Sequence, residues 1–357
     1  MTLHPLLALA QDRDVRHSSG FRRAAADLSG EVLAAHFADE RRDAPRRSDS
    51  GKRFLQPHGG RPPAERQRSK DEEHLAAALV RSCRDAGKPL TLPDEGGSVE
   101  FVDWGVPLKA AAADAALGDA DPNRGVERVD LVGVTPEGRL VLGFIKYLEP
   151  NAARAGTGDT PLRFLLDSLA HAAIVEANRA AIGAELQTAH ARTFSEVPAV
   201  VLLLASPRYW ALCRRREAQK GAAWVHELER LAREIEQHIG VSVYFLGMGL
   251  EGDPGWIYDE QGARLPSVRI DRAWEPGAGR VRPKPKPRPK AAEPVETVVE
   301  AALERPVRSY GPHESYHPGD RIEHPTLGLG VVQKCFPGKV EVRFGEATSR
   351  LVAGRPL

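Results

Sequence analysis

The sequence contains few cysteines, no long apolar run and almost no net charge. Cys83, Cys213 and Cys335 lie far apart, so they form neither a disulfide framework nor a zinc cluster. No apolar run approaches the roughly 18 residues that a membrane-spanning helix needs. The first residues also lack the basic region of a signal peptide. We therefore expect a protein of the reducing cytoplasm that has no membrane partner.

The formal net charge of +1 excludes a nucleic-acid-binding surface that extends over the whole chain. Any such surface must be local. The 357 residues are enough for two or three domains, with ample length for a hydrophobic core. A composition rich in Ala, Arg, Gly and Pro and poor in Lys is typical of high-GC bacterial genomes, so we expect a bacterial source.

Composition divides the chain into five segments. Residues 38–70 are polar, basic and rich in Gly and Pro, and they hold too little apolar surface to become ordered. Residues 280–290 alternate Pro with cations, which favours an extended polyproline II spacer. The sequence therefore predicts a short helical segment at 1–37, a basic flexible linker at 38–70, an α/β domain at 71–274, a linker rich in Pro, Lys and Arg at 275–313, and a small β-domain at 314–357.

The α/β segment alternates predicted helices with predicted strands. "DEEHLAAALVRSCRDAG" is an amphipathic helix with acidic residues in its first turn, and a long helix begins near Pro161. "RVDLVGV" and "RLVLGFIKYL" are strands joined by the turn "TPEG". "VPAVVLLLAS" and "VSVYFLGMGL" are apolar enough to be strands buried on both faces. This order predicts a mixed, three-layer α/β sandwich.

The predicted hairpin carries residues that suit metal-dependent phosphodiester hydrolysis. Asp130 lies early in the first strand, and Lys146 lies late in the second, antiparallel strand. Side chains alternate between the faces of a strand, so positions 144 and 146 share a face that the turn brings back toward Asp130. In such a site carboxylates hold a divalent ion that generates hydroxide, and a lysine stabilises the charge of the transition state. Phe144 stands where a second carboxylate is expected.

This segment resembles the PD-(D/E)XK, or restriction-endonuclease-like, nuclease superfamily over almost the whole α/β segment. Asp130 matches the aspartate of the family motif and Lys146 matches its lysine, whereas Phe144 departs from it. The resemblance implies a three-layer restriction-endonuclease-like sandwich with a mixed central sheet. It also implies that Asp130 and Lys146 are catalytic positions and that Asp130 and Glu73, with Glu72 as the next match, would hold Mg²⁺ or Mn²⁺.

A phenyl ring offers no oxygen to a divalent cation, which leaves several hypotheses open. The first is a degenerate nuclease domain that binds DNA, or a protein on DNA, without efficient cleavage. The second is an active Mg²⁺- or Mn²⁺-dependent nuclease of repair or phage defence, in which Asp167, Glu176 or Glu149 replaces the missing acid. Glu149 lies on the opposite face of a regular strand from Lys146, which counts against it. In a purely structural interpretation, Lys146 simply emerges at the end of a core strand.

Several cations are candidates for contacts with the DNA backbone. They are Lys146 in the hairpin, Arg214, Arg215 and Arg216 in a predicted helix, and Arg282, Lys284 and Lys286 in the linker. A solvated helix face and a solubilising spacer are the alternative interpretations of the helical and linker cations.

The C-terminal segment contains "GDRIEHPTLGLGVVQKCF" and "GKVEVRF", which are short strands separated by Gly and Pro turns. His324, Pro325, Gly328 and Gly330 are part of a pattern that resembles a second family, the small Tudor- or SH3-like barrel of bacterial repair helicases and of CarD-type domains that bind RNA polymerase. The resemblance implies RNA polymerase, a repair helicase or nucleic acid as a partner. A third hypothesis is therefore an adaptor that docks on transcription or repair machinery.

Two local features of this segment have direct physical interpretations. His324 and Pro325 are expected to build a turn rather than to bind a metal, because no second His or Cys is near. Gly328 and Gly330 are expected to allow either a positive φ or a close approach of strands.

Overall fold

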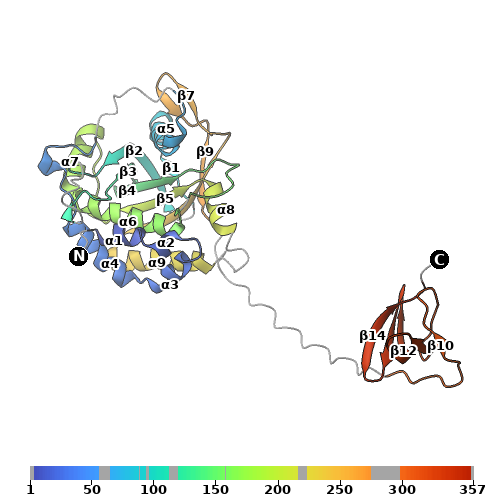
Figure 1. Cartoon of the computed structure of the whole chain (residues 1–357). Helices are drawn as coiled ribbons and strands as arrows, with labels where there is room; N and C mark the ends of the chain where they lie inside the picture. Colours follow the sequence, from blue (N-terminus) through green and yellow to red (C-terminus); the bar gives the residue numbers. More distant parts are fainter. Residues whose placement is uncertain are drawn as a thin grey trace. The chain divides into compact units, whose positions relative to one another are not determined.

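The computed structural model describes residues 4–55, 65–87, 89–93, 96–111, 120–156, 158–215, 223–274 and 298–354. The chain forms two compact units, Met1–Arg282 and Pro283–Leu357, and the second is drawn in red in Figure 1. We call them the N-terminal and the C-terminal unit. Among the described residues, no helix is both long enough and apolar enough to cross a membrane.

The N-terminal unit is built on a mixed sheet with the strand order β1-β2-β3-β4-β5-β6-β9. Its strands are β1 (Leu90–Thr91), β2 (Ser98–Pro107), β3 (Arg128–Val134), β4 (Leu140–Lys146), β5 (Val200–Ala205), β6 (Ser242–Leu250) and β9 (Val268–Arg272). The strands β2, β3 and β4 form an antiparallel meander, β5 and β6 run parallel to β4, and β9 is antiparallel to β6. The predicted mixed α/β class and the predicted hairpin are confirmed.

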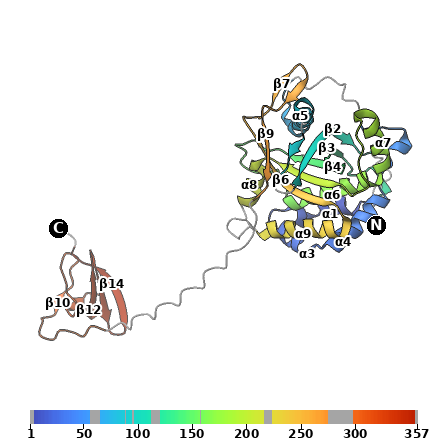
Figure 2. The ribbon, with the colours of Figure 1, turned by 180° about the vertical axis from the view of Figure 1, so that it is seen from behind.

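Helices cover both faces of this sheet (Figures 1 and 2). The helix α5 (Asp71–Ala86) lies on one face with the hairpin of β7 (Ile257–Asp259) and β8 (Gly262–Arg264). The other face is covered by α6 (Pro161–Ala177), α8 (Pro207–Arg215) and α9 (Ala223–Ile239), and α7 (Arg179–His190) follows α6. Because β4 and β5 are parallel, the chain must cross a face between them, and α6 and α7 make that crossover.

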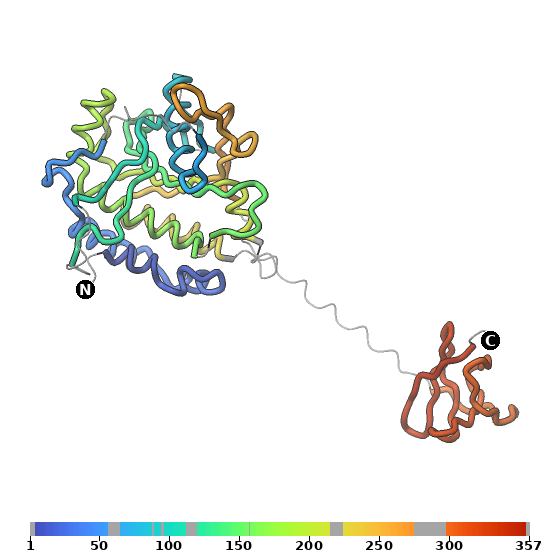
Figure 3. The backbone as a smooth tube through the Cα atoms, turned by 45° about the horizontal axis from the view of Figure 1, so that its top comes forward, coloured from blue at the N-terminus to red at the C-terminus, as the bar shows by residue number. Residues whose placement is uncertain are grey.

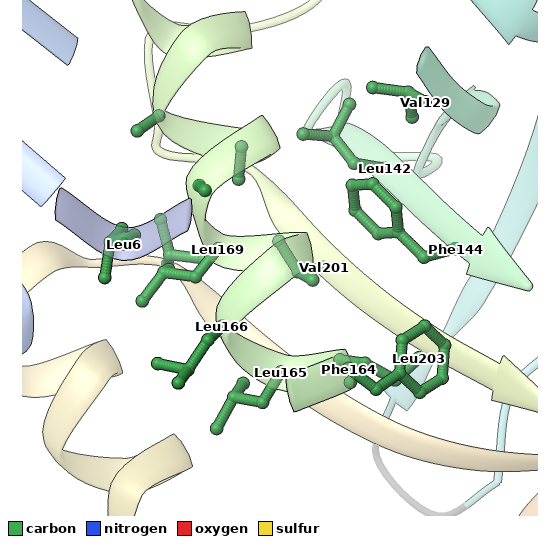
Figure 4. Close-up of a cluster of buried hydrophobic side chains, with 14 of the residues drawn as sticks. Leu6, Val129, Leu142, Phe144, Phe164, Leu165, Leu166, Leu169, Val201 and Leu203 are labelled. Carbon is green, nitrogen blue, oxygen red and sulfur yellow. The ribbon is translucent and has the colours of Figure 1, made fainter. Parts of the chain in front are cut away.

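The alternation of side chains along the strands produces one hydrophobic core on each face. Leu131 and Ile145 face α5, whereas Leu142, Phe144 and Leu203 belong to the core on the α6 side. Figure 4 shows Phe144 on β4 among the apolar side chains of that second core. The run of apolar residues in β5 is buried on both faces, as expected for a central strand.

The first residues of the chain add a further layer to the α6 side. The helices α1 (Pro5–Ala10), α2 (Arg13–Arg16), α3 (Phe21–Asp27) and α4 (Gly30–Arg42) pack on α6 and α9, as Figure 3 also shows. Leu6 and Leu33 are fully buried in the same core as the sheet. The predicted helical segment therefore extends beyond residue 37 and belongs to the N-terminal unit.

The segment predicted as a flexible linker at 38–70 is packed where the structure describes it after α4. Phe54 and Leu55 are buried, and both of their amides donate to the carboxylate of Glu185, at 3.2 and 2.7 Å. The Arg47 guanidinium donates to the carbonyl of Lys109. This corrects the prediction for residues 38–55. The average composition of the segment is polar, but the apolar pair Phe54 and Leu55 is sufficient to anchor it. Residues 56–64 lie outside the described part.

A buried ion pair joins the first helix to the fourth. The His4 ring contacts Glu40 Oε1 at 2.6 Å through Nδ1 and the Pro122 carbonyl at 2.8 Å through Nε2. Both partners are acceptors, so both ring nitrogens donate and the imidazole is protonated. Burial alone would lower the pKa of His4, but the hydrogen bond and charge of Glu40 raise it above its ordinary value. The other oxygen of Glu40 accepts from the Leu6 amide at 3.0 Å.

The C-terminal unit is a five-stranded sheet with the order β10-β11-β12-β13-β14. Its strands are β10 (Arg308–Ser309), β11 (Arg321–His324), β12 (Gly328–Phe336), β13 (Lys339–Phe344) and β14 (Ala347–Val352). A small core of Ile322, Val332 and Val342 lies within it. The predicted separate β-unit is confirmed. It begins earlier than predicted, because Ala302, which lies in the segment assigned to the linker at 275–313, donates its backbone amide to the Gly319 carbonyl. Residues 275–297 lie outside the described part.

Two glycines of this unit have the roles that the sequence suggested. Gly328 has a φ of +74°, and a Cβ there would meet open space. Gly330 needs its missing side chain for another reason, because a Cβ there would lie 2.5 Å from the Phe344 ring and 2.7 Å from Val342. The turn between β11 and β12 is held by His324, whose Nδ1 accepts from the amides of Thr326 and Leu327 at 3.3 Å.

We predict that Glu40→Ala lowers the free energy of unfolding at pH 6 by about 3–5 kcal/mol, because it leaves a buried imidazolium unpaired. A histidine whose pKa is raised on folding stabilises the folded state fully at pH values below its unfolded-state pKa of about 6.5. This stabilisation is lost as the pH rises through the folded-state pKa. The deficit should therefore shrink above pH 7. Denaturant unfolding at several pH values measures it. Asp39→Ala, which removes a surface partner of Arg42, is the control; an equal loss in both variants contradicts the prediction.

We predict that Gly330→Ala destabilises the C-terminal sheet by about 2–3 kcal/mol through overpacking. Gly328→Ala should cost only about 1 kcal/mol, from backbone strain alone. Hydrogen exchange of β12 and β13 in the full chain measures both effects. Equal protection in the two variants would show that Phe344 does not crowd Gly330.

Candidate functional site

Asp130 lies where β3 and β4 separate. The last ladder pair before this point joins Leu131 to Gly143, and the same register places Asp130 opposite Phe144. Beyond that pair the backbone amide of Ile145 donates to Asp130 Oδ2 at 2.8 Å, in place of a carbonyl of β3. A buried amide needs an acceptor, so this carboxylate completes the end of the sheet.

A second carboxylate reaches the same strand end from the other face. Glu72, in the first turn of α5, accepts from the Tyr147 amide at 3.2 Å through Oε1. Glu73, which the sequence favoured as a ligand, instead pairs with Arg128 at 3.1 Å. The structure therefore brings Glu72, the second choice of the sequence analysis, to Asp130.

Lys146 ends β4 beside these acids. Its Nζ lies 3.9 Å from Asp159 Oδ1 and 6.0 Å from the centre of the Phe164 ring. Burial alone would lower the pKa of Lys146, but Glu72, Asp159 and Asp130 together raise it above its ordinary value. The ammonium group therefore stays protonated at neutral pH, with 31% of the side chain exposed.

The two carboxyl groups at the strand end, those of Asp130 and Glu72, have pKa values above those of ordinary acids. Burial raises the pKa of Asp130 to about 7, with Glu72 adding to the rise and the Ile145 amide opposing it. Burial also raises the pKa of Glu72, against the attraction of Lys146. Perturbed acids that surround a lysine are common in functional sites, although buried ion-pair networks share this property.

Phe144 fills the place of the expected second motif carboxylate. Its side chain is only 6% exposed and faces α6, where its ring centre lies 6.1 Å from that of His171. His171 has a structural role, because its Nδ1 donates to the Asp167 carbonyl at 2.6 Å and its Nε2 accepts from the Glu127 amide at 3.0 Å. Position 144 is therefore part of the hydrophobic core.

The site does not fit a resident metal ion. Across the described ranges, no group of three or more His, Cys, Asp or Glu side chains could hold one. Mg²⁺ requires oxygen ligands in near-octahedral geometry, and the ammonium of Lys146 already supplies the counter-charge to Glu72 and Asp130. We therefore derive no chemical step through Mg²⁺ or Mn²⁺.

The acids proposed as replacements for a carboxylate at position 144 form pairs with arginines: Asp167 with Arg163 at 3.2 Å, Glu176 with Arg179 at 2.7 Å, and Glu149 with Arg66 at 3.0 Å. The acid nearest to Lys146 among the salt bridges of the described residues is Asp159. The sequence analysis missed Asp159, whose only signal is its place directly before the Thr160-Pro161 helix start.

Of the other predicted DNA contacts, only Arg214 has a side chain within the described part. Arg214 is partly exposed in α8. The Arg215 side chain lies outside the described part, as do Arg216, Arg282, Lys284 and Lys286.

No protein-family model, curated protein or solved structure matches this chain. The candidate site is therefore defined by its own geometry. It consists of Glu72, Asp130, Lys146 and Asp159, with Phe144 beside them.

We predict that Asp130→Asn stabilises the chain at pH 8 and has little effect at pH 4. A carboxyl whose pKa is raised from 3.8 to about 7 destabilises the folded state progressively between those two pH values. The amide side chain still accepts from Ile145 but carries no charge. The gain in unfolding free energy should reach about 4 kcal/mol above pH 7, at about 1.36 kcal/mol for each pKa unit, measured by denaturant unfolding.

Glu73→Gln is the matched control, because Glu73 forms a surface pair with Arg128. Its effect should be small and should not grow between pH 4 and pH 7. A pH-independent effect of Asp130→Asn would contradict the assignment of a raised pKa to Asp130.

Proposed function

We propose that the N-terminal unit is a nuclease-derived domain that binds DNA and does not cut it efficiently. The observation that carries this proposal is the phenyl ring of Phe144 opposite Asp130, in a site that otherwise gathers Glu72, Asp130 and Lys146. Two acids and an ammonium gather near the positions that the nuclease resemblance implies, and the side chain at position 144 offers no oxygen ligand, which supports binding without efficient cleavage.

The order of elements supports a restriction-endonuclease-like sandwich. The helix α5 precedes a three-stranded antiparallel meander, and α6 then crosses to the parallel strand β5. Helices lie on both faces of this sheet. The layer of α1 to α4 is an addition to that plan.

One cation of the site can contact a phosphate. Lys146 is protonated and partly exposed, so its ammonium can donate to a phosphate oxygen. Without a metal-bound hydroxide no strong nucleophile forms at this site, and binding without cleavage is the expected outcome.

A second candidate function is an active Mg²⁺- or Mn²⁺-dependent nuclease. The observation that bears on it is Asp159, which lies 3.9 Å from Lys146 on the loop before α6. This acid would have to move to join a ligand set, because the described residues contain no group of three His, Cys, Asp or Glu side chains that could hold a metal ion. In this candidate function, a carboxylate from the loop before α6 would bind the metal ion in place of the carboxylate that is missing at position 144.

We further propose that the C-terminal unit is a Tudor- or SH3-like barrel that docks on a protein of transcription or repair, such as RNA polymerase or a repair helicase. Leu327, Leu329 and Phe336 are 44%, 57% and 43% exposed on this small unit. Exposed apolar side chains of this size support a protein contact.

We predict that the chain shifts duplex DNA in electrophoresis but does not nick supercoiled plasmid with Mg²⁺ or Mn²⁺. Phe144→Glu should create metal-dependent cleavage, because it restores the missing carboxylate. Asp130→Ala in that background should abolish the cleavage. Phe144→Gln, of similar size but without charge, is the control and should not cut.

The outcomes separate the two functions. Cleavage by the unaltered chain that is lost in both Asp130→Ala and Asp159→Ala establishes the active nuclease. No shift with duplex, branched or single-stranded DNA refutes the DNA-binding proposal, whatever Phe144→Glu does. Circular dichroism of each variant excludes loss of fold as the cause.

A further inference from the structure

A pocket adjoins the candidate site on the far side of Asp159. Its volume is about 680 Å³, and it lies between the turn from α2 to α3, the loop before α6 and the end of α8. Arg16, Arg154 and Asp159 are its charged lining residues, with His17 beside them, and Phe21 and Leu212 are among the apolar ones. None of the functions considered above uses it.

The walls of this pocket are tied together by hydrogen bonds. The Thr160 hydroxyl donates to the Val15 carbonyl at 2.6 Å and accepts from the Arg163 amide at 3.1 Å, which joins α2 to the start of α6. Thr160 is buried. On the third side, Arg208 of α8 donates to the Ala152 carbonyl at 2.7 Å. The pocket is therefore formed before any ligand binds.

One arginine lies directly against the loop backbone. Gly158 has a φ of +80°, and a Cβ there would lie 2.9 Å from Arg16 Nε. Neither Arg16 nor Arg154 has an acidic partner among the residues that the structure describes. Their guanidinium groups are exposed and free to bind an anion from the pocket.

The acid in the lining does not cancel these charges. Asp159 Oδ1 lies 3.9 Å from Lys146 Nζ and 3.8 Å from Arg163 Nη1, so two cations outside the lining balance it. The two pocket arginines then leave a net positive charge. Guanidinium groups suit phosphate in particular, because their paired N–H donors match its oxygens.

We propose that this pocket binds the phosphate group of a nucleotide, with Arg16 and Arg154 on the phosphate and the nucleoside in the remaining space between the loop before α6 and the end of α8. A volume of about 680 Å³ lies within the range of small-molecule sites and exceeds what one phosphate ion fills. The proposal requires phosphate recognition only, so it holds whether or not the strand end of β4 binds or cuts DNA.

The test is titration calorimetry of the full chain with deoxyadenosine monophosphate, deoxyadenosine and inorganic phosphate. The monophosphate should bind more tightly than either of the other two. Arg16→Gln with Arg154→Gln should raise its Kd at least about tenfold, since a charged hydrogen bond contributes about 1.5–3 kcal/mol. Arg13→Gln, another exposed arginine of α2 outside the pocket, is the matched control and should leave the Kd unchanged.

A pair of oligonucleotides that differ only in a 5′-phosphate identifies the source of the nucleotide. Tighter binding of the phosphorylated strand, lost in the double variant, assigns the pocket to a strand end; binding of the monophosphate alone assigns it to a free nucleotide. Equal affinity for deoxyadenosine and its monophosphate overturns the proposal, as does an unchanged Kd in the double variant. Binding of duplex DNA that persists in the double variant leaves the proposed function of the strand end intact.

Discussion

Three backbone groups at the end of β4 are satisfied from three different elements, and the arrangement of the candidate site follows from this. The Ile145 amide donates to Asp130 of β3, the Tyr147 amide donates to Glu72 of α5, and the Lys146 carbonyl accepts from the Ser206 amide after β5. Buried backbone groups must find partners. Asp130 and Glu72 are therefore held beside Lys146 by the same bonds that end the strand.

This arrangement explains why a phenyl ring is tolerated at one position of the motif. The side chain of residue 144 supports no backbone group, because β4 is paired along this stretch with the parallel strand β5. Its side chain points into the core under α6, where an aromatic ring packs well. Loss of the side-chain oxygens of Asp130 or Glu72 would instead leave an amide without an acceptor.

Much of the fold could be predicted because its strands carry strong apolar patterns, and β3, β4, β5 and β6 lie where those patterns are. The choice between Glu72 and Glu73 depends on how α5 is rotated over the sheet, which a helix pattern alone does not fix. Asp159 lies in a loop, where no periodicity marks a residue. The packing of Phe54 could not be predicted from local composition, because that segment is ordered by a long-range partner, Glu185.

The outer layer of α1 to α4 has a consequence for synthesis of the chain. The amide of Gly30 at the start of α4 donates to Glu234 Oε2 of α9 at 2.7 Å, across 204 positions of sequence. Ribosomes add about 5–20 residues per second, so α4 emerges about 10–40 s before its partner helix exists. During that interval the first four helices can pack on α6 once it is made, but the part of their core that α9 supplies is still missing. The first 42 residues of the chain thus complete their folding only after α9 has been made.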